Sequence, residues 1–200
     1  MKLVLATRNH GKIREMAEIL APLNIEVLSM DAFPDFPEVE EDGETFLENA
    51  VKKARVTAQA TGEIALADDS GLEVDCLDGR PGVHSARFAG EPKDDRANNE
   101  KLLSLMADVP PERRTARFRC AIAVVTPGGE VHTTDGTCEG VIIGEPRGGG
   151  GFGYDPLFYL RQYGKTFAEL DLATKNKISH RGRALAGALG ILAELSSRRS

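Results

Sequence analysis

The sequence predicts an α/β protein, in which buried strands and helices alternate along the chain. Residues 1–6, which contain the apolar run 3–6, predict a short buried strand, and after a polar loop the apolar side chains at helical spacing in residues 12–21 predict a helix. Residues 116–124 alternate in the period of a strand that buries one face more than the other. The 200 residues are enough for a sizeable core, and we expect one domain over residues 1–200.

The remaining elements follow in order. Residues 25–28 are a second strand candidate, and a loop rich in proline and acidic residues comes next. Thr45 and Glu48 have the spacing of a capping box, so we expect a long helix from there to about residue 61. The apolar run at residues 64–67 predicts a strand that ends in Asp68 and Asp69, and an extended pattern resumes at residues 72–74.

The C-terminal half continues the pattern. The Pro-Gly-Gly stretch at residues 127–129 predicts a hairpin turn, and residues 141–143 predict a short strand. A last helix is expected to begin near Ser179, because apolar side chains then fall at helical spacing at Leu185, Ala188, Leu189 and Leu192.

The charges are unevenly distributed. The net charge is −6, and residues 15–49 contain eleven acidic residues and no Lys or Arg. An acidic chain argues against nucleic-acid binding, which needs a basic face, whereas a split into acidic and basic zones suits a phosphate ligand bound with a divalent cation. Within the acidic segment we expect Glu15 and Glu18 to lie on the solvated face of the first helix.

Two further features bear on location. The apolar run near the start, residues 3–6, is shorter than the about 7–15 residues of a secretory signal or the about 20 of a membrane span, so we expect a cytoplasmic protein with no membrane partner. Cys76, Cys120 and Cys138 are far apart and odd in number, which favours buried thiols over a zinc or redox motif.

The loop after the first strand is a candidate phosphate site. A helix N-terminus offers unpaired amides and a positive dipole end, and this loop adds a hydroxyl, an amide and an ammonium. A helix cap with a solvated lysine is an equally good interpretation, and Ile13 excludes a Walker loop because Ser or Thr would stand there. The candidate residues are Thr7, Arg8, Asn9, His10, Gly11 and Lys12.

Acidic residues form a candidate magnesium site. Mg²⁺ prefers oxygen ligands and takes one or two carboxylates together with substrate phosphates and waters. Two acidic clusters would suit it if they meet in space, although an acidic loop is more often solvated surface. They are Glu40, Glu41 and Asp42 in the loop, with Glu38 as a further candidate, and Asp68 and Asp69 at the strand end.

Two stretches near the C-terminus could bind a nucleoside. Four consecutive glycines at residues 148–151 indicate a close backbone approach or a mobile loop, and Phe152 or Tyr154 could stack on a base while Asp155 accepts hydrogen bonds. The alternative is a flexible hairpin with a core aromatic residue. His180 and Arg181 place two donors at the start of the last helix, after Lys175.

In combination these stretches resemble the inosine triphosphate pyrophosphatase family, which includes the bacterial dITP/XTP pyrophosphatases. The resemblance runs nearly end to end, through LATRNHGK, EEDGETFLENAVKKA, ADDSGLEVDCLDGRPGVHSARFAG, GGGGFGYDPLFY and KNKISHRGRAL. It implies a long mixed β-sheet flanked by helices, in two lobes around a central cleft, and a homodimer.

The resemblance also implies a role for each matched residue. Thr7 to Lys12 would hold the triphosphate, with a further phosphate contact from Lys53. Glu41 and Asp69 would bind Mg²⁺, with Glu40 as an alternative to Glu41, and Asp69 would be the general base. Ser70 would touch the substrate, and His180 and Arg181 would read the base. The nucleoside would be framed by Phe152, Gly153, Tyr154, Asp155 and Lys175.

The implied reaction is Mg²⁺-dependent hydrolysis of ITP, dITP or XTP to the monophosphate and pyrophosphate, which removes these nucleotides from the pool. Two rival interpretations are the related Maf pyrophosphatases, whose motifs differ from those here, and a module that binds nucleotides without hydrolysing them. Carboxylates concentrated beside a polyphosphate favour catalysis, because a binding module gains little from them.

Overall fold

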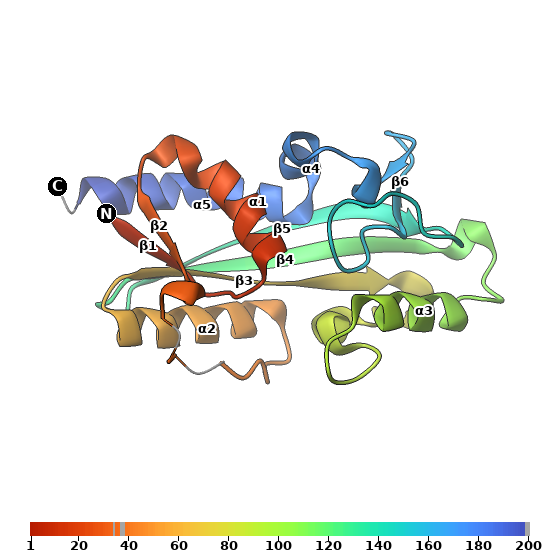
Figure 1. Ribbon diagram of the computed structural model, residues 1–200, viewed down its shortest axis with the longest axis horizontal. Coiled ribbons are helices and arrows are strands. Elements are labelled where there is room, and N and C mark those ends of the chain that lie inside the picture. Colours follow the sequence, from red (N-terminus) through yellow and green to blue (C-terminus); the bar gives the residue numbers. More distant parts are fainter. Residues whose placement is uncertain (34, 37–38, 199–200) are drawn as a thin grey trace. The chain divides into compact units, whose positions relative to one another are not determined.

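The computed structural model describes residues 1–33, 35–36 and 39–198, so Glu38 lies outside the described residues. Within them, the strands form a seven-stranded sheet in the order β2-β1-β3-β4-β5-β6-β7 (Figure 1). β1 pairs in parallel with β2 and β3, whereas β6 is antiparallel to β5 and β7, which confirms a mixed sheet. The strands are β1 (Lys2–Leu5), β2 (Glu26–Ser29), β3 (Ile64–Val74), β4 (Thr115–Val125), β5 (Val131–Ile142), β6 (Phe158–Leu160) and β7 (Lys165–Thr166).

The α-helices are α1 (His10–Leu20), α2 (Phe46–Thr61), α3 (Asp95–Leu105), α4 (Leu172–Ile178) and α5 (His180–Ser197). Helices α1, α2 and α3 lie in the connections β1–β2, β2–β3 and β3–β4, and α4 and α5 follow β7. Short 3-10 turns are η1 (Ala21–Leu23), η2 (Met30–Ala32), η3 (Asp75–Leu77), η4 (Gly82–Arg87), η5 (Pro111–Arg113) and η6 (Phe167–Glu169). In the part of the chain that the structure describes, no helix combines the length and apolar character needed to cross a bilayer.

The chain divides into two compact units. Unit 1 comprises residues 1–69, 120–136 and 180–200, and unit 2 comprises residues 70–119 and 137–179. β3, β4 and β5 are long enough to contribute to both units, and two boundaries fall next to candidate site residues, at Asp69–Ser70 and at Ser179–His180. Each unit has a hydrophobic core of its own.

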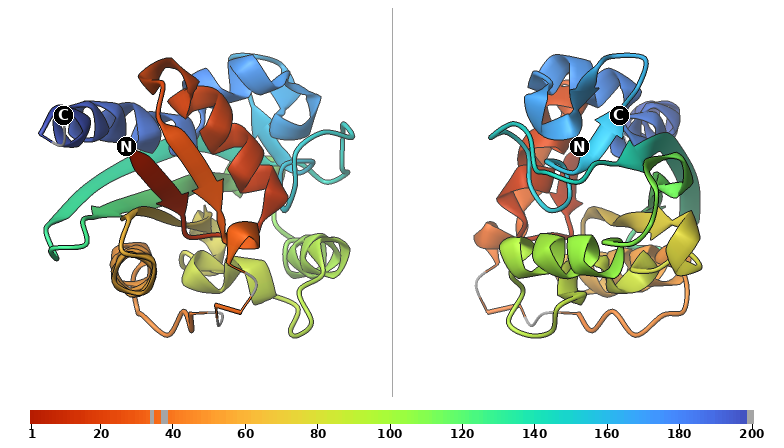
Figure 2. Two further views of the ribbon diagram at one scale, coloured as in Figure 1. Left: turned by 60° about the vertical axis from the view of Figure 1, so that its left-hand side comes forward. Right: turned by 90° about the vertical axis from the view of Figure 1, so that its right-hand side faces the viewer.

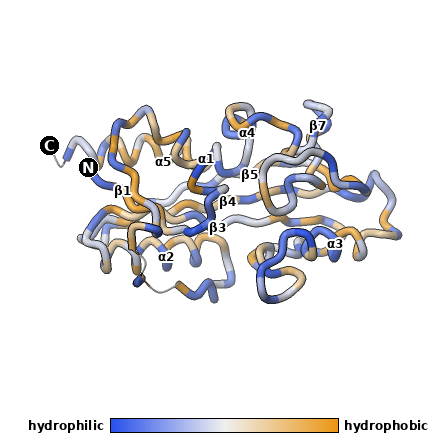
Figure 3. The backbone as a smooth tube through the Cα atoms, viewed as in Figure 1, coloured by the Kyte–Doolittle hydropathy of each residue, from blue (hydrophilic) through white to orange (hydrophobic). Residues whose placement is uncertain are grey.

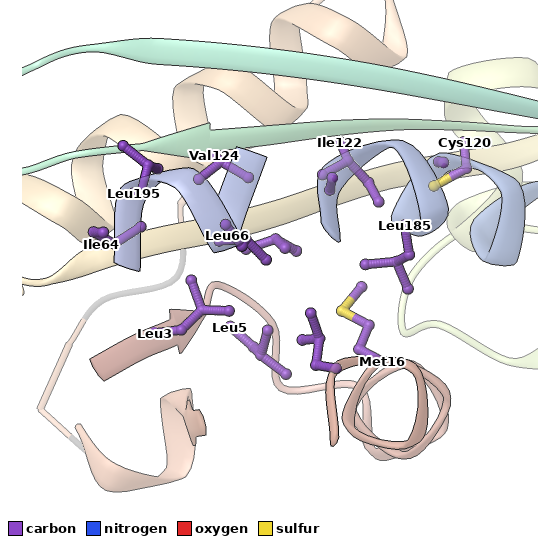
Figure 4. Close-up of a cluster of buried hydrophobic side chains, with 14 residues drawn as sticks. Leu3, Leu5, Met16, Ile64, Leu66, Cys120, Ile122, Val124, Leu185 and Leu195 are labelled. Atoms are coloured by element: carbon purple, nitrogen blue, oxygen red, sulfur yellow. The ribbon is translucent and has the colours of Figure 1, made fainter. Parts of the chain in front are cut away.

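The core of unit 1 packs two helices against the sheet. Leu3 and Leu5 of β1 meet Met16 of α1 and Leu185 of α5 in this cluster (Figure 4). α1 and α5 cover one face of the unit's strands and α2 covers the other (Figures 1 and 2). The strand residues between these layers are therefore buried on both sides, which explains the nearly continuous burial of residues 64–69.

The core of unit 2 is aromatic. The Phe118 and Phe158 rings meet edge-on with centroids 4.7 Å apart, and Phe167 stacks on Phe118 at 5.7 Å. α3 closes this unit with Leu102 and Met106 in the core, while its first turns are hydrophilic (Figure 3). Because α3 has few apolar residues at helical spacing, the sequence did not predict it, and its start is set by Asp94, which accepts from the amides of Arg96 and Ala97.

Several expected elements are confirmed and others are extended. α2 has the full capping box of Thr45 and Glu48, and Gly129 adopts the left-handed φ of 90° in the turn between β4 and β5. The short strand expected at residues 141–143 is the end of β5. β3 does not end at Asp69 but runs on to Val74, so both aspartates lie inside a strand.

Candidate active site

Asp68 and Asp69 are adjacent in β3, and their side chains have different neighbours. Asp68 contacts Lys12 of α1 and Arg181 of α5, whereas Asp69 accepts a hydrogen bond from Asn49 of α2. Successive side chains of a strand point to opposite faces, and α2 covers the face opposite α1 and α5 (Figure 1). The two carboxylates therefore do not form one acidic pair, but serve two separate clusters.

The first cluster surrounds Asp69. Asn49 Nδ2 lies 3.0 Å from Asp69 Oδ2, and Lys53 Nζ lies 4.0 Å from Asp69 Oδ1. The same ammonium donates to the Glu41 carboxylate and, at 2.8 Å, to the Asp68 main-chain oxygen. Glu41 and Asp69 thus converge on one positive charge. Burial alone would lower the pKa of Lys53, but Glu41, Asp69 and Asp68 outweigh it and raise that pKa.

Asp69 is held as a stronger base than a free aspartate. The residue is 5% exposed, and burial is the largest cause of its raised pKa. Lys53 and Lys12 oppose that rise, while the negative charge of Glu41 adds to it. A raised pKa brings a carboxylate nearer to the range in which it accepts a proton at neutral pH.

The donor set of this cluster fits a magnesium ion. Two carboxylates and a main-chain carbonyl converge on the Lys53 ammonium, and oxygen atoms of these kinds are the ligands that Mg²⁺ takes from proteins. Among the described residues no group of three or more His, Cys, Asp or Glu forms a metal cage, so a cation here would depend on further oxygen ligands from waters or phosphates. Asp42 is turned to Lys52, at 2.5 Å.

The second cluster is a buried chain of alternating charges. Arg181 donates through Nη2 and Nε to Asp68 Oδ2 at 3.0 and 3.1 Å, and through Nη1 to Glu15. Lys12 Nζ lies 3.0 Å from the same Asp68 oxygen. Burial would raise the pKa of Asp68, but Lys12, Arg181 and Lys53 lower it overall, so this carboxylate stays ionised. Glu15 was expected on the solvated face of the first helix, and this prediction was wrong. Glu15 is buried, because it is the second buried partner of Arg181.

The loop at residues 7–12, which the sequence predicted to hold phosphate, caps the N-terminus of α1. Asn9 accepts from the Lys12 amide at 3.2 Å, and Thr7 Oγ1 accepts from the Asn9 amide at 3.1 Å. α1 begins at His10, so Gly11 and Lys12 lie in its first turn. Arg8 turns instead to the main-chain carbonyls of Met30, Phe33 and Phe36.

In unit 2, the expected nucleoside loop is tightly held. Asp155 accepts from the Phe152 amide at 2.9 Å and from Lys175 Nζ at 2.5 Å, and that ammonium lies 4.9 Å from the Phe152 ring centre. A Cβ on Gly151 would lie 2.0 Å from Asp155 Oδ2, and Gly151 has a φ of +69°. The glycine run therefore reflects a close backbone approach.

The other predicted residues, Ser70, Lys175 and His180, lie within β3, α4 and α5. Ser70 continues β3 and is half-buried, while His180 opens α5 and is buried. α4, which the sequence did not predict, ends at Ile178 and carries Lys175. Gly136 approaches the His180 carbonyl so closely that a Cβ there would lie 2.1 Å from it. The start of α5 therefore depends on a glycine in β5.

Two residues of the site were missed. Asn49 bonds Asp69 and also accepts from the Gly43 amide at 2.7 Å, and Glu15 completes the buried charge chain. A signal for Asn49 existed, because it lies four residues before Lys53 on the buried face of α2, where a polar residue needs a partner. The partner of Glu15 is 166 positions away, which no local pattern reveals.

These features define an α/β protein whose mixed sheet carries two buried charged clusters, one that gathers Glu41 and Asp69 around Lys53 and one that joins Lys12 and Arg181 to Asp68. Comparison with known proteins identifies the family. Residues 3–190 match the Ham1 family, and the chain belongs to that family. It is 64% identical over 195 residues to the dITP/XTP pyrophosphatase of Desulforamulus reducens, covering 98% of this chain and 97% of the relative. It is 62% identical over 185 residues to that of Geobacter sulfurreducens, covering 92% and 93%.

Solved structures share the fold. The Ham1 protein from Coxiella burnetii superposes with a TM-score of 0.87 at 43% identity, covering 97% of this chain and 99% of that one. The nucleoside-triphosphatase / dITP/XTP pyrophosphatase from Mycobacterium abscessus superposes with a TM-score of 0.75 at 46% identity, covering 94% and 99%. The expected fold and family are confirmed.

Proposed function

We propose that this chain is a dITP/XTP pyrophosphatase, which hydrolyses ITP, dITP and XTP to the nucleoside monophosphate and pyrophosphate and so removes them from the nucleotide pool. The observation that carries the proposal is the convergence of Glu41 and Asp69 on the Lys53 ammonium, because it combines a buried base with oxygen ligands for a cation. Relatives at 64% and 62% identity bear the same activity in their names.

In this reaction Asp69 takes a proton from a water molecule as the water oxygen attacks the α-phosphorus. A new bond from phosphorus to that oxygen forms, the bond from the α-phosphorus to the bridging oxygen breaks, and pyrophosphate leaves with the bonding electrons. The raised pKa of Asp69 supports its role as the base. Asn49 fixes the orientation of the carboxylate.

The proposal assigns Mg²⁺ to Glu41 and Asp69. A bound Mg²⁺ supplies Lewis-acid neutralisation of phosphate charge and lowers the pKa of a coordinated water. Lys53 partly neutralises these two carboxylates, and its ammonium would add a phosphate contact beside the cation. Glu41 is preferred to Glu40 as the ligand because Glu41 is the one that meets Lys53 beside Asp69.

The triphosphate is assigned to the start of α1. Lys12 and the first amides of the helix offset the charge of the leaving pyrophosphate, and the loop hydroxyl of Thr7 adds a donor. Lys12 is anchored by Asp68, so its ammonium is held in one place before substrate arrives. The other phosphate residues in this proposal are Arg8, Asn9, His10 and Gly11.

The nucleoside is assigned to Phe152–Asp155 and Lys175, with His180 and Arg181 reading the base and Ser70 as a further substrate contact. Hypoxanthine and xanthine present an oxygen where adenine presents an amino group, so donors at this position favour the former and face a donor in adenine. The Lys175 ammonium lies over the Phe152 ring in a cation–π contact, which supports a role for this ring in stacking on the nucleoside base.

Location and assembly follow the family resemblance. We propose that the protein acts in the cytoplasm, where free nucleotides are used for synthesis, and that it is a homodimer with no nucleic-acid or membrane partner. Sedimentation of the purified chain measures the oligomeric state directly.

The activity is tested by incubating the purified protein with Mg²⁺ and each of ITP, XTP, dITP, ATP, GTP and dUTP, with pyrophosphate and orthophosphate measured separately. Pyrophosphate from ITP, XTP and dITP, and little from the others, is expected. Orthophosphate as the product would indicate cleavage at another bond, and tight binding of ITP without turnover would favour a nucleotide-binding module.

A further inference from the structure

Both main-chain groups of Gly153 are held by side chains from the first turns of α3. The Gly153 amide donates to Asp95 Oδ2 at 2.8 Å, and its carbonyl accepts from Asn99 Nδ2 at 2.9 Å. Asp95 and Asn99 are four residues apart, so they lie on the same side of the helix. The Asn99 amide also donates to the main-chain oxygen of Asp95, at 2.7 Å, which ties the two together.

We propose that Asp95 and Asn99 are positioning residues for the nucleoside, and that they act by fixing the main chain of the loop that carries Phe152 and Asp155. This inference rests on the proposed function, because it takes that loop as the nucleoside contact. Neither residue needs to touch the substrate. Their task is to hold Gly153, the residue between Phe152 and Tyr154, in one conformation.

The conformation at Gly153 needs such support. Gly153 has a φ of +59°, a left-handed backbone that glycine adopts easily but also leaves easily. Tyr154 anchors the following position by donating to the Ser85 carbonyl at 2.7 Å, and Asp155 accepts from the Phe152 amide at 2.9 Å. We call the two hydrogen bonds from Asp95 and Asn99 to Gly153 the α3 clamp. Without this clamp, the main chain at Gly153 would be restrained only through Tyr154 and Asp155, and the direction of the Phe152 ring would be less well defined. A loop that must be ordered on binding costs affinity, and a preformed loop avoids that cost.

The position of Asn99 matches a role in the clamp better than a role in the core. Its Oδ1 is buried and accepts no hydrogen bond within the described residues, while Nδ2 donates to two carbonyls. An isosteric change to aspartate would therefore place a carboxylate oxygen against two carbonyl oxygens and reverse the attraction. The core of unit 2 does not include this side chain.

The test uses the full-length chain with Asn99→Asp, Asn99→Ala and Asp95→Ala, and measures kcat and KM for ITP together with inhibition by inorganic tripolyphosphate. Each variant should raise KM about tenfold, with the largest rise for Asn99→Asp, while kcat at saturating ITP changes less than about twofold. Tripolyphosphate has no nucleoside, so its inhibition constant should stay unchanged. Arg96→Gln, which removes only an exposed ion pair with Glu100 on the same helix, is the matched control.

The outcomes separate the inference from the function on which it rests. If the wild-type protein does not release pyrophosphate from ITP, the proposed function fails. If it does, and the three variants keep the wild-type KM, the positioning role is overturned. A loss of kcat together with weaker tripolyphosphate inhibition would also overturn it, because the change would then have spread to the phosphate and catalytic residues. Melting temperatures measured alongside identify any variant that has lost its fold, and Asn99→Ala, which adds no charge, then decides the case.

Discussion

The carboxylates of Asp68 and Asp69 are neighbours in sequence but belong to different clusters of the site. Asp68 is joined to Lys12 and Arg181, and Asp69 to Asn49 with Glu41 and Lys53 nearby. A strand between two layers of helices can in this way carry a structural anion on one face and a reactive one on the other. The two residues should therefore respond differently to the same substitution.

Asp69→Asn should abolish turnover and leave substrate binding largely intact. The amide cannot take a proton from water, so kcat should fall by a factor of about 10² to 10⁴, measured at saturating Mg²⁺ because the proposal also assigns this residue to the cation. Calorimetric titration of the variant with ITP measures binding. An unchanged kcat would remove Asp69 as the base.

Asp68→Asn should mainly lower stability. An amide cannot balance the buried charges of Lys12 and Arg181, and breaking a buried ion pair from one side costs about 3–5 kcal/mol. Urea unfolding followed by circular dichroism measures the free energy. Asp42→Asn is the matched control, because its pair with Lys52 is exposed and should contribute little. Equal stability of the two variants would contradict the inferred role of the buried chain.

Glu41→Gln should raise the Mg²⁺ concentration needed for half-maximal activity by about tenfold or more, since one of two carboxylate ligands is lost. The adjacent Glu40→Gln is the control and should behave like the wild type. Titration of Mg²⁺ at a fixed ITP concentration gives the half-maximal Mg²⁺ concentration of each variant. EDTA should stop turnover in both variants and in the wild type. The reverse ranking would make Glu40 the ligand.

Lys12→Ala should weaken binding of the triphosphate. Both KM for ITP and the inhibition constant of tripolyphosphate should rise, because the proposal assigns the same phosphates to the ammonium and to the first amides of α1. Unchanged constants would count against a phosphate site at the start of α1. Stability should fall less than in Asp68→Asn, because Asp68 keeps Arg181 as its partner.

Cys120 should react slowly with thiol reagents in the folded protein. Burial, together with the nearby charge of Asp68, raises the pKa of its thiol to about 12, although Arg181 and Lys12 act in the lowering direction. At pH 8 its thiolate fraction is then on the order of 10⁻⁴, and it grows only as the pH approaches that pKa. Iodoacetamide labelling with mass spectrometry should find Cys76, which is half-buried, modified first. Rapid labelling of Cys120 at pH 8 without denaturant would contradict this prediction.

Part of the fold was determined by local patterns in the sequence. The apolar runs of β1 and β3, the alternation of β4 and the capping box of α2 each depend on residues within a few positions of one another. α3 has a polar first half, and α4 has only seven residues, so neither has a long apolar pattern along the chain. Local patterns in the sequence therefore did not predict either helix.

For the site, the sequence by itself determined the inventory: acidic residues in one loop and one strand, a polar loop before α1, and a glycine run before Phe152. Tertiary structure decided how these groups are paired. Arg181 lies 113 positions from Asp68 and 166 from Glu15, and Asn99 lies 54 positions from Gly153. Such pairs form only when the layers pack around the sheet, because a hydrogen bond depends on distance in space and on burial, which spacing along the chain does not encode.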